Sequence, residues 1–218
     1  MIQETKKQIE AKKIIAIART ISGEPLYNFA GAILKGGVEL LEVTYNQTDP
    51  AALENTAESI RQLIQRFPQM VIGAGTVLNR EQVKAAADAG AKYIVAPNTD
   101  VDVIKATKEL GLISIPGAMT PTEIMTAHNA GADYIKLFPC DYLGKGYIKD
   151  IFGPISHLKF IATGGISAEN LETYLSLGIL GAGIGGQLCN KKLIAEGKFD
   201  EIEAYARKLT DIAASIKG

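Results

Sequence analysis

The chain has 218 residues, 47% of them hydrophobic and 22% charged, and this size and composition predict a single globular domain over residues 1–218. Its formal net charge of −1 gives no electrostatic reason to expect nucleic acid or an anionic membrane as a partner. The charged N-terminal segment has the character of neither a secretory signal nor a membrane span, so we expect a cytoplasmic location.

Eight short apolar runs rich in β-branched residues recur along the chain, and each is a candidate strand. In chain order they are Ile14–Ala18, Glu39–Val43, Val71–Ala74, Tyr93–Val95, Ile113–Ile115, Tyr134–Phe138, Phe160–Ala162 and Leu180–Ile184. Segments with helical periodicity separate them, for example Arg80–Ala89 and Thr120–Ala130. The second segment opens with Thr120 as the N-cap, Pro121 at the first helical position and Glu123 as the partner in a capping box.

Glycines stand ahead of several strands, where a left-handed glycine commonly ends a helix. They are Gly36-Gly37, Gly90, Gly111, Gly131 and Gly178. Further helices are expected at Ile2–Ala11 and Phe199–Ile216. The alternation of strand and helix requires parallel strands, and eight such units predict a (β/α)8 TIM barrel of the α/β class with an extra N-terminal helix. A doubly wound open sheet shares these local signals, but it usually has fewer strands and a glycine-rich first turn, where this chain has Ala18-Arg19-Thr20.

The active site of such a barrel lies where its strands end and their loops begin. The candidate residues at these positions are Arg19, Glu42, Thr76, Pro97, Lys136, Thr163-Gly164-Gly165 and Gly185-Gly186. Lys136 lies inside an apolar strand, so its amine is expected in the barrel lumen, where desolvation lowers its pKa. A neutral amine is the form that condenses with a ketone to give a Schiff base. The alternative is a strand-end lysine that reaches solvent or pairs with a carboxylate.

Glu42 places a charge of opposite sign inside a second predicted strand, at a comparable depth. If both side chains enter one lumen, Glu42 can move protons between the substrate and the lysine, directly or through a water. Two other interpretations stay open. One is a buried Lys136–Glu42 ion pair without chemistry, and the other is a Glu42 side chain on the outer surface, against a helix.

Glycine-rich turns follow three of the predicted strands. Gly73-Ala74-Gly75-Thr76 indicates either close backbone approach to a ligand, with the Thr76 hydroxyl as a hydrogen-bonding group, or a tight turn in which Thr76 caps the next helix. Thr163–Ser167 and Gly183–Gln187 follow strands seven and eight, where barrels commonly bind phosphate through backbone amides and a helix N-terminus. Together they predict a phosphorylated substrate, unless both are simple turn glycines.

The cysteines and histidines give no pattern typical of a metal site. Cys140 and Cys189 are far apart without a C-x-x-C spacing, and His128 and His157 are isolated. We therefore expect no disulfide, no metal and no cofactor.

Five motifs appear in the order typical of one enzyme family. They are Leu41-Glu42-Val43-Thr44, Gly73-Ala74-Gly75-Thr76-Val77-Leu78, Ile115-Pro116-Gly117, Ile135-Lys136-Leu137-Phe138-Pro139 and Thr163-Gly164-Gly165-Ile166. Over nearly its entire length the chain resembles the 2-keto-3-deoxy-6-phosphogluconate / 4-hydroxy-2-oxoglutarate aldolase family. The resemblance implies a homotrimer without metal, Lys136 as the Schiff-base lysine, Glu42 as the general acid/base and Thr76 as a contact to the pyruvyl portion. It also implies a phosphate cradle made of Thr163, Gly164, Gly165, Gly185 and Gly186.

The chain departs from that family in two places. Many phosphogluconate aldolases carry a carboxylate-clamping arginine where this chain has Tyr45-Asn46. The related phosphogalactonate subgroup has an asparagine there, a Pro-Asn like Pro97-Asn98 after strand four, and an arginine after strand one, a place that Arg19 occupies. Thr163, in contrast, is of the phosphogluconate type. Gln187 replaces the usual serine of the last loop, so phosphate contact there is expected to rest on backbone amides.

We therefore expect a class I, Schiff-base aldolase that cleaves a 2-keto-3-deoxy-6-phospho sugar acid to pyruvate and glyceraldehyde 3-phosphate, with Arg19 and Thr76 holding the carboxylate. The configuration at carbon four and the use of unphosphorylated 4-hydroxy-2-oxoglutarate stay open. A phospho-sugar isomerase or synthase on the same barrel is the main alternative, with Glu42 as base and Lys136 as an electrostatic stabiliser. A non-catalytic phospho-sugar sensor is a third, although no appended DNA-binding segment supports it.

Overall fold

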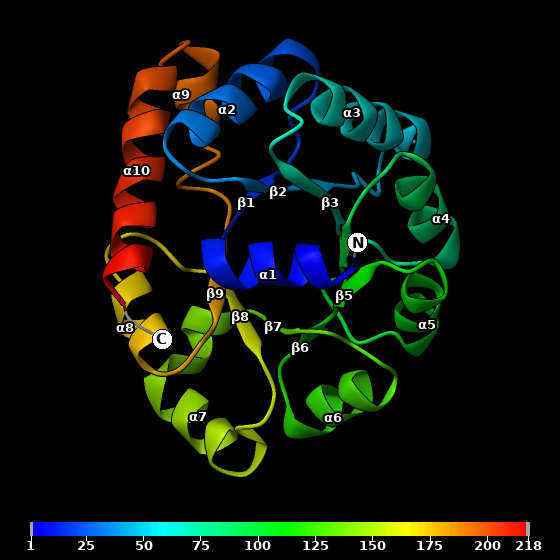
Figure 1. Cartoon of the computed structure of the whole chain (residues 1–218), viewed down its shortest axis with the longest axis vertical. Helices are drawn as coiled ribbons and strands as arrows, with labels where there is room; N and C mark the ends of the chain where they lie inside the picture. Colours follow the sequence, from blue (N-terminus) through cyan, green and yellow to red (C-terminus); the bar gives the residue numbers. More distant parts are fainter. Residues whose placement is uncertain (1, 217–218) are drawn as a thin grey trace.

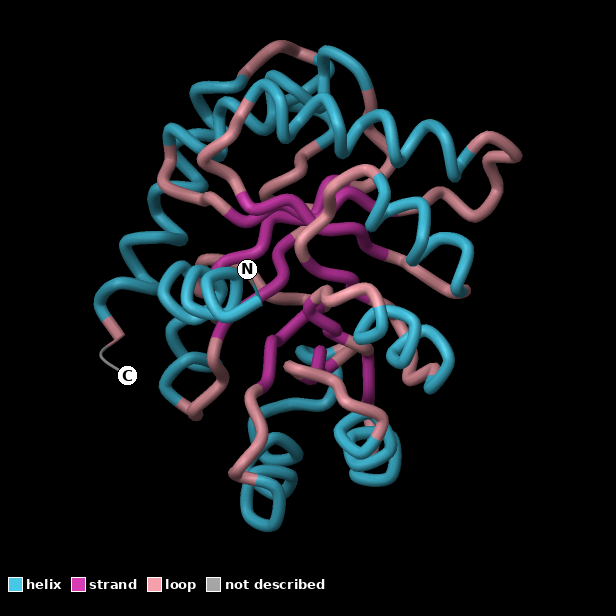
Figure 2. Tube along the Cα trace, turned by 45° about the vertical axis from the view of Figure 1, so that its right-hand side comes forward, coloured by secondary structure: helices cyan, strands magenta, loops and turns pink. Residues whose placement is uncertain are grey.

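The computed structural model describes residues 2–216 and contains one parallel sheet that curls into a barrel, with helices around it (Figure 1). The strands are β1 Ile14–Ala18, β2 Leu40–Thr44, β3 Val71–Gly75, β4 Tyr93–Val95, β5 Ile113–Ile115, β6 Gly117–Ala118, β7 Ile135–Leu137, β8 Phe160–Thr163 and β9 Gly181–Ile184. The helices are α1 Ile2–Lys12, α2 Gly23–Lys35, α3 Ala52–Arg66, α4 Arg80–Asp88, α5 Val101–Glu109, α6 Pro121–Asn129, α7 Cys140–Ile155, α8 Leu171–Ser176, α9 Lys191–Ala195 and α10 Phe199–Ser215. Figure 2 shows the strands gathered at the centre and the helices outside them.

The nine described strands follow the order β5-β4-β3-β2-β1-β9-β8-β7-β6, and the barrel closes between β5 and β6. These two strands are the halves of one extended segment that Pro116 interrupts, because proline has no N–H to donate to a sheet. The backbone N–H of Lys136 donates to the Pro116 carbonyl at 2.9 Å, and the N–H of Tyr134 donates to the Ser114 carbonyl at 3.3 Å. The predicted eight-unit barrel is therefore confirmed, with its fifth strand broken in two.

Strand residues alternate between the barrel lumen and the surrounding helices. One buried cluster joins lumen residues of several strands to Ile9 of α1: Ile9, Ile15, Leu40, Val71, Tyr93, Val95, Ile113, Ile115, Tyr134 and Ile161. Helix α1 lies across one end of the barrel, as Figure 1 shows. Lys6 of this helix forms an ion pair with Asp133 at 2.7 Å, and Glu10 forms one with Lys159 at 2.7 Å. The extra N-terminal helix predicted from the sequence thus closes the floor of the barrel.

The local signals agree with the structure, with small shifts at element ends. The capping box of Thr120 and Glu123 is present at the start of α6. Gly37, Gly90, Gly111, Gly131 and Gly178 all have positive φ, as predicted; within the Gly36-Gly37 pair the left-handed residue is Gly37, and Gly36 has φ −77. Strand β2 begins one residue later than predicted and includes Thr44. No helix in the described range is long and apolar enough to span a bilayer.

Candidate active site

Two buried charged side chains face the barrel lumen from opposite walls. Glu42 lies in the middle of β2 and Lys136 in the middle of β7, and only 3% and 5% of their surfaces are exposed. Residues two positions apart on a strand point to the same face. Glu42 is two positions from Leu40 and Lys136 is two positions from Tyr134, and Leu40 and Tyr134 belong to the lumen cluster. This placement decides against the outward-facing Glu42 and the solvent-reaching Lys136. Within the described residues the two side chains form no ion pair at 4.0 Å or less.

Burial shifts the pKa values of both groups toward their uncharged forms. It raises the pKa of the Glu42 carboxyl, and the positive charges of Lys136 and Arg19 offset part of that rise. It lowers the pKa of the Lys136 amine; the charge of Glu42 opposes this shift, and that of Arg19 adds to it. The lumen therefore favours the neutral amine that nucleophilic attack on a carbonyl requires.

The backbone makes room for these charges through glycines on β3. A Cβ on Gly75 would lie 1.8 Å from Oε1 of Glu42, and a Cβ on Gly73 would lie 2.3 Å from the Tyr93 ring. A side chain at Gly75 would therefore displace Glu42, and one at Gly73 would displace the Tyr93 ring. The hydroxyl of Tyr93 is buried with no hydrogen-bond partner among the described residues. Burial raises its pKa, and the charge of Glu42 adds to the rise.

A pocket of about 660 Å³ opens at the ends of β1, β8 and β9. Its lining includes six of the predicted site residues: Arg19, Thr163, Gly164, Gly165, Gly185 and Gly186. Phe138 also lines it, and the ring of Phe138 lies 4.8 Å from the Lys136 amine, so this side chain connects the pocket to the buried lysine. Gly164 and Gly165 have φ values of 90 and 80, which only glycine adopts readily.

Five predicted residues do not line this pocket: Glu42 and Lys136, which lie in the lumen, and Asn46, Thr76 and Pro97. Asn46 faces a smaller neighbouring pocket, and its Oδ1 accepts hydrogen bonds from the backbone and hydroxyl of Thr48. Thr76 has φ 55, a strained value for a β-branched residue, and its carbonyl accepts a hydrogen bond from Gln47. It does not cap the next helix, because Asn79 is the N-cap of α4. Pro97 follows β4 with its carbonyl packed against Gly117.

Sequence reasoning did not single out several residues of the site. Phe138 is two positions after Lys136, so strand alternation could have placed it on the same side. Lys191 and Lys192 line the pocket from the start of α9, and no sequence signal marked them. Tyr205 of α10 contacts Gln187 across a long stretch of chain, a tertiary relationship that no local pattern encodes.

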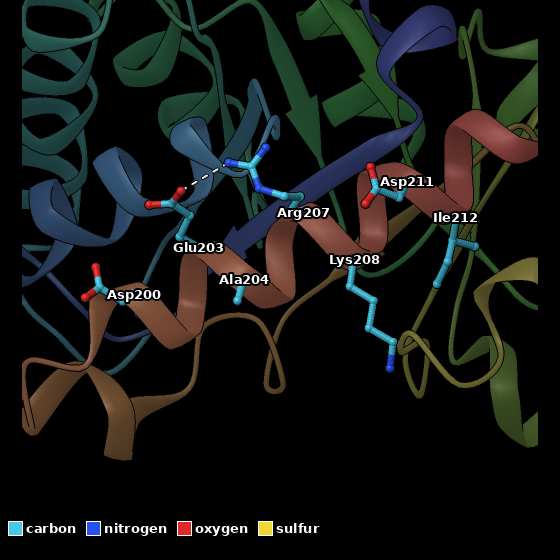
Figure 3. A pocket seen from close by; sticks show the side chains of 7 residues that line it. All are labelled: Asp200, Glu203, Ala204, Arg207, Lys208, Asp211 and Ile212. Carbon is cyan, nitrogen blue, oxygen red and sulfur yellow. Dashed lines mark hydrogen bonds and ion pairs between the residues drawn. The ribbon is translucent and has the colours of Figure 1, made fainter.

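A second hollow of about 600 Å³ runs along the outside of α10 and contains none of the predicted site residues. Figure 3 shows its side chains, which all project from this one helix, with a single ion pair between Glu203 and Arg207. It is an open surface groove that shares no lining residue with the pocket at the ends of β1, β8 and β9. Within the described residues, no group of three or more histidine, cysteine or acidic side chains is placed to hold a metal ion.

Comparison with known proteins assigns this chain to a family. Residues 5–205 match the family model described as KDPG and KHG aldolase. The 2-dehydro-3-deoxy-phosphogluconate aldolase of Haemophilus influenzae is 30% identical over 96% of this chain and 97% of its own. The 2-dehydro-3-deoxy-6-phosphogalactonate aldolase of Escherichia coli K12 is 35% identical over 89% of this chain and 93% of its own.

A solved structure gives the same result. The KDPG aldolase of Legionella pneumophila, with pyruvate captured as a covalent carbinolamine intermediate, superposes with a TM-score of 0.82 at 28% identity, over 92% of this chain and 95% of its own. The family resemblance drawn from the five motifs is thereby confirmed. This chain belongs to the KDPG and KHG aldolase family.

Proposed function

We propose that the protein is a class I aldolase that cleaves 2-keto-3-deoxy-6-phosphogluconate, or its galactonate epimer, to pyruvate and glyceraldehyde 3-phosphate. The observation that carries this proposal is the buried Lys136 amine, whose pKa is lowered. The ring of Phe138 lies against this amine and also lines the glycine-rich pocket. The curated relatives named for these two activities support it, and so does the Legionella pneumophila relative that binds pyruvate covalently.

In the proposed reaction the neutral Lys136 amine attacks the C2 carbonyl of the substrate and forms a carbinolamine, which loses water to give an iminium ion. Glu42, through a water, takes the proton of the C4 hydroxyl. The C3–C4 bond then breaks, its electron pair moves into the iminium to form an enamine, and the aldehyde leaves. Protonation of the enamine at C3 and addition of water release pyruvate and restore the amine. The iminium is the electron sink, so these steps need no cofactor.

The remaining site residues are proposed to orient the substrate. Arg19 and Thr76 hold the carboxylate, with Asn46 and Pro97 beside them. The phosphate binds at Thr163 and the backbone amides of Gly164, Gly165, Gly185 and Gly186. Support for this assignment comes from the shared lining of the pocket, in which Arg19 faces the glycine loops of β8 and β9.

The configuration at carbon four is the open part of the substrate assignment. Asn46, Arg19 and Pro97 favour the galactonate series, whereas Thr163 favours the gluconate series, and relatives of both kinds are 30% or more identical to this chain. The decisive experiment measures pyruvate release from the two epimeric phospho-acids and from 4-hydroxy-2-oxoglutarate. We expect cleavage of at least one phospho-acid and its loss in Lys136→Met. Cleavage that survives in Lys136→Met would refute the Schiff-base proposal.

A phospho-sugar isomerase or synthase is the weaker candidate. Such an enzyme would use Glu42 as a base without a covalent adduct on Lys136. The family match over residues 5–205 does not favour it. Isomerisation or condensation of a phospho-sugar without pyruvate release would identify it.

A homotrimer and a cytoplasmic location are further parts of the proposal. The trimer rests on the family resemblance, and it is consistent with exposed apolar side chains at Leu78, Leu110 and Met119. Light scattering on the purified protein tests it, because the chain has a mass of 23.3 kDa and the proposal requires three times that value. A monomer at micromolar concentration would contradict it.

A further inference from the structure

We propose that Gln187 is a binding residue for the phosphate end of the substrate, and that Tyr205 of α10 positions it. The inference rests on the proposed aldolase function and deepens it, because it assigns a side-chain donor to a loop where only backbone amides were expected. It also gives the C-terminal helix a role in substrate specificity.

The hydrogen bonds of Tyr205 fix the orientation of the Gln187 amide. The backbone N–H of Ala168 donates to the Tyr205 hydroxyl at 3.0 Å, and the hydroxyl donates to Oε1 of Gln187 at 3.0 Å. A backbone N–H can only donate, so the hydroxyl must accept from Ala168, and its single proton is left for Gln187. The oxygen of the Gln187 amide is thereby held toward Tyr205. Nε2, with two hydrogens to donate, is the free end, and it has no partner among the described residues.

Gln187 lines two cavities, as Gly186 and Asn190 also do. It lines the 660 Å³ pocket together with Gly185 and Gly186, and it also lines the smaller hollow in which Tyr205 lies. With Oε1 engaged by Tyr205, the donor end of the amide is available to the larger pocket. An amide nitrogen is a suitable partner for a phosphate oxygen, since phosphate oxygens are acceptors.

The charged side chains that line the larger pocket suit an anion, and the acidic Glu201 lines only the smaller hollow. Lys191 and Lys192 line the same pocket immediately beyond the loop, and Arg19 lines it from β1. No acidic residue is among the described residues that line it. The field at the pocket therefore favours a negatively charged group, and Gln187 adds a directional donor to these flexible cations.

Tyr205 also connects the two loops that build the pocket. Ala168 belongs to the loop after β8, which begins with Gly164 and Gly165, and Gln187 belongs to the loop after β9. Glycine-rich segments lose more conformational freedom on ordering than other segments do. The Tyr205 hydroxyl, which bonds both loops from α10, restricts their conformational freedom before the ligand binds. Ligand binding then costs less conformational entropy. Helix α10 is a firm base for it, because Ile202, Ala206 and Leu209 are buried and the helix packs mainly against α2.

The test compares phosphorylated and unphosphorylated substrates in four variants. Gln187→Ala removes the donor, Gln187→Glu replaces it with an anion, and Tyr205→Phe removes the tether. Tyr27→Phe is the matched control, because Tyr27 is a half-buried tyrosine under Arg66, away from the pocket. We expect KM for the phospho-acid to rise about tenfold in Gln187→Ala and less in Tyr205→Phe, with kcat little changed, and the largest rise in Gln187→Glu.

Three further readouts separate phosphate recognition from a general structural role. KM for 4-hydroxy-2-oxoglutarate should not change, and inhibition by inorganic phosphate should weaken in parallel with KM for the phospho-acid. In a double-mutant cycle, Tyr205→Phe should have little further effect once Gln187 is alanine. An equal rise in KM for both substrates, or an unchanged KM for the phospho-acid in Gln187→Ala, would overturn the inference.

Failure of the proposed function would be visible separately. If no variant and no wild-type sample forms a pyruvate adduct on Lys136, the aldolase assignment fails, whatever Gln187 does. Binding of inorganic phosphate to the wild-type protein and to Gln187→Ala, measured by calorimetry, then still decides the inference. Equal affinity in the two proteins would refute it, and a loss of about tenfold would support it.

Discussion

Gly75 of β3 lies so close to the carboxylate of Glu42 on β2 that a Cβ at this position would be 1.8 Å from Oε1. Gly75→Ala must therefore displace the Glu42 side chain, since the strand backbone around it is buried on both faces. A general base moved by about 1 Å loses much of its efficiency, so we expect kcat to fall by roughly a hundredfold. Steady-state pyruvate release measures this effect.

The control for that variant is Gly153→Ala in α7, where a Cβ meets no atom within 4 Å. This variant should keep its activity and lose no stability. An active Gly75→Ala protein with unchanged kcat would show that Glu42 does not act on the substrate from the position described.

The two buried ionisable side chains, Glu42 and Lys136, should make the protein less stable than uncharged side chains of similar shape would. Glu42 and Lys136 are both almost fully buried, and desolvation is the largest cause of each pKa shift. We expect the double variant Glu42→Gln, Lys136→Met to be inactive and more stable by about 1–4 kcal/mol. Urea unfolding measures the difference. A less stable double variant would indicate that the pair contributes net stability.

The stability gain of the double variant Glu42→Gln, Lys136→Met should depend on pH. The pKa of Glu42 is higher in the folded protein than in the unfolded chain. Glu42 therefore lowers the stability of the protein progressively as pH rises from its unfolded-state pKa to its folded-state pKa. The pKa of Lys136 is lower in the folded protein than in the unfolded chain. Lys136 therefore lowers the stability of the protein progressively as pH falls from its unfolded-state pKa to its folded-state pKa. The stability gain of the double variant should therefore be largest near neutral pH and shrink toward both extremes, as unfolding curves over a pH series would show. A gain independent of pH would contradict these shifts.

Arg19 should influence the pH dependence of adduct formation. Its positive charge helps to lower the pKa of the Lys136 amine. The rate of reducible adduct formation at saturating pyruvate should rise with pH through a pKa below the ordinary lysine value of about 10.4. In Arg19→Met we expect that rise to move to higher pH and KM for pyruvate to increase. Arg61→Met on α3, whose guanidinium pairs with Glu54 and Glu58, is the control and should not shift the profile.

Tyr93→Phe should stabilise the protein or leave its stability unchanged. The Tyr93 hydroxyl is buried without a partner among the described residues, and an unpaired buried donor costs about 1–3 kcal/mol. Tyr134→Phe is the matched comparison, because the Tyr134 hydroxyl donates to Glu10 at 2.9 Å and its removal should destabilise. Chemical denaturation of both variants measures the contrast. Equal destabilisation would mean that the Tyr93 hydroxyl also has a partner.

Most of the fold could be predicted from the sequence, because strand and helix signals in this chain are local. Apolar runs such as Ile14–Ala18 and Ile113–Ile115 coincide with observed strands, and Thr120 caps its helix as its capping box predicts. The break at Pro116 was not predicted, since the sequence alone does not show that the chain continues as a strand on both sides of this proline. The sequence did not show which glycine of the Gly36-Gly37 pair is left-handed, and in the structure it is Gly37.

The site was partly predictable for the same reason. Charged residues inside two apolar runs were enough to make the lumen the expected place for Glu42 and Lys136. An outward-facing Glu42 and a solvent-reaching Lys136 stayed open as alternatives. The tether from Tyr205 to Gln187 was not, because it joins residues from separate elements of the folded chain. The strained conformation of Thr76 is likewise tertiary, since Gln47 holds its carbonyl from the neighbouring loop.

Reduction of the protein with borohydride in the presence of pyruvate, followed by peptide mapping, is the most direct test of the central claim. We expect one pyruvyl group per chain, attached to Lys136, and no such group in Lys136→Met. A pyruvyl group on another lysine, or cleavage of a phospho-acid without any reducible adduct, would contradict the account.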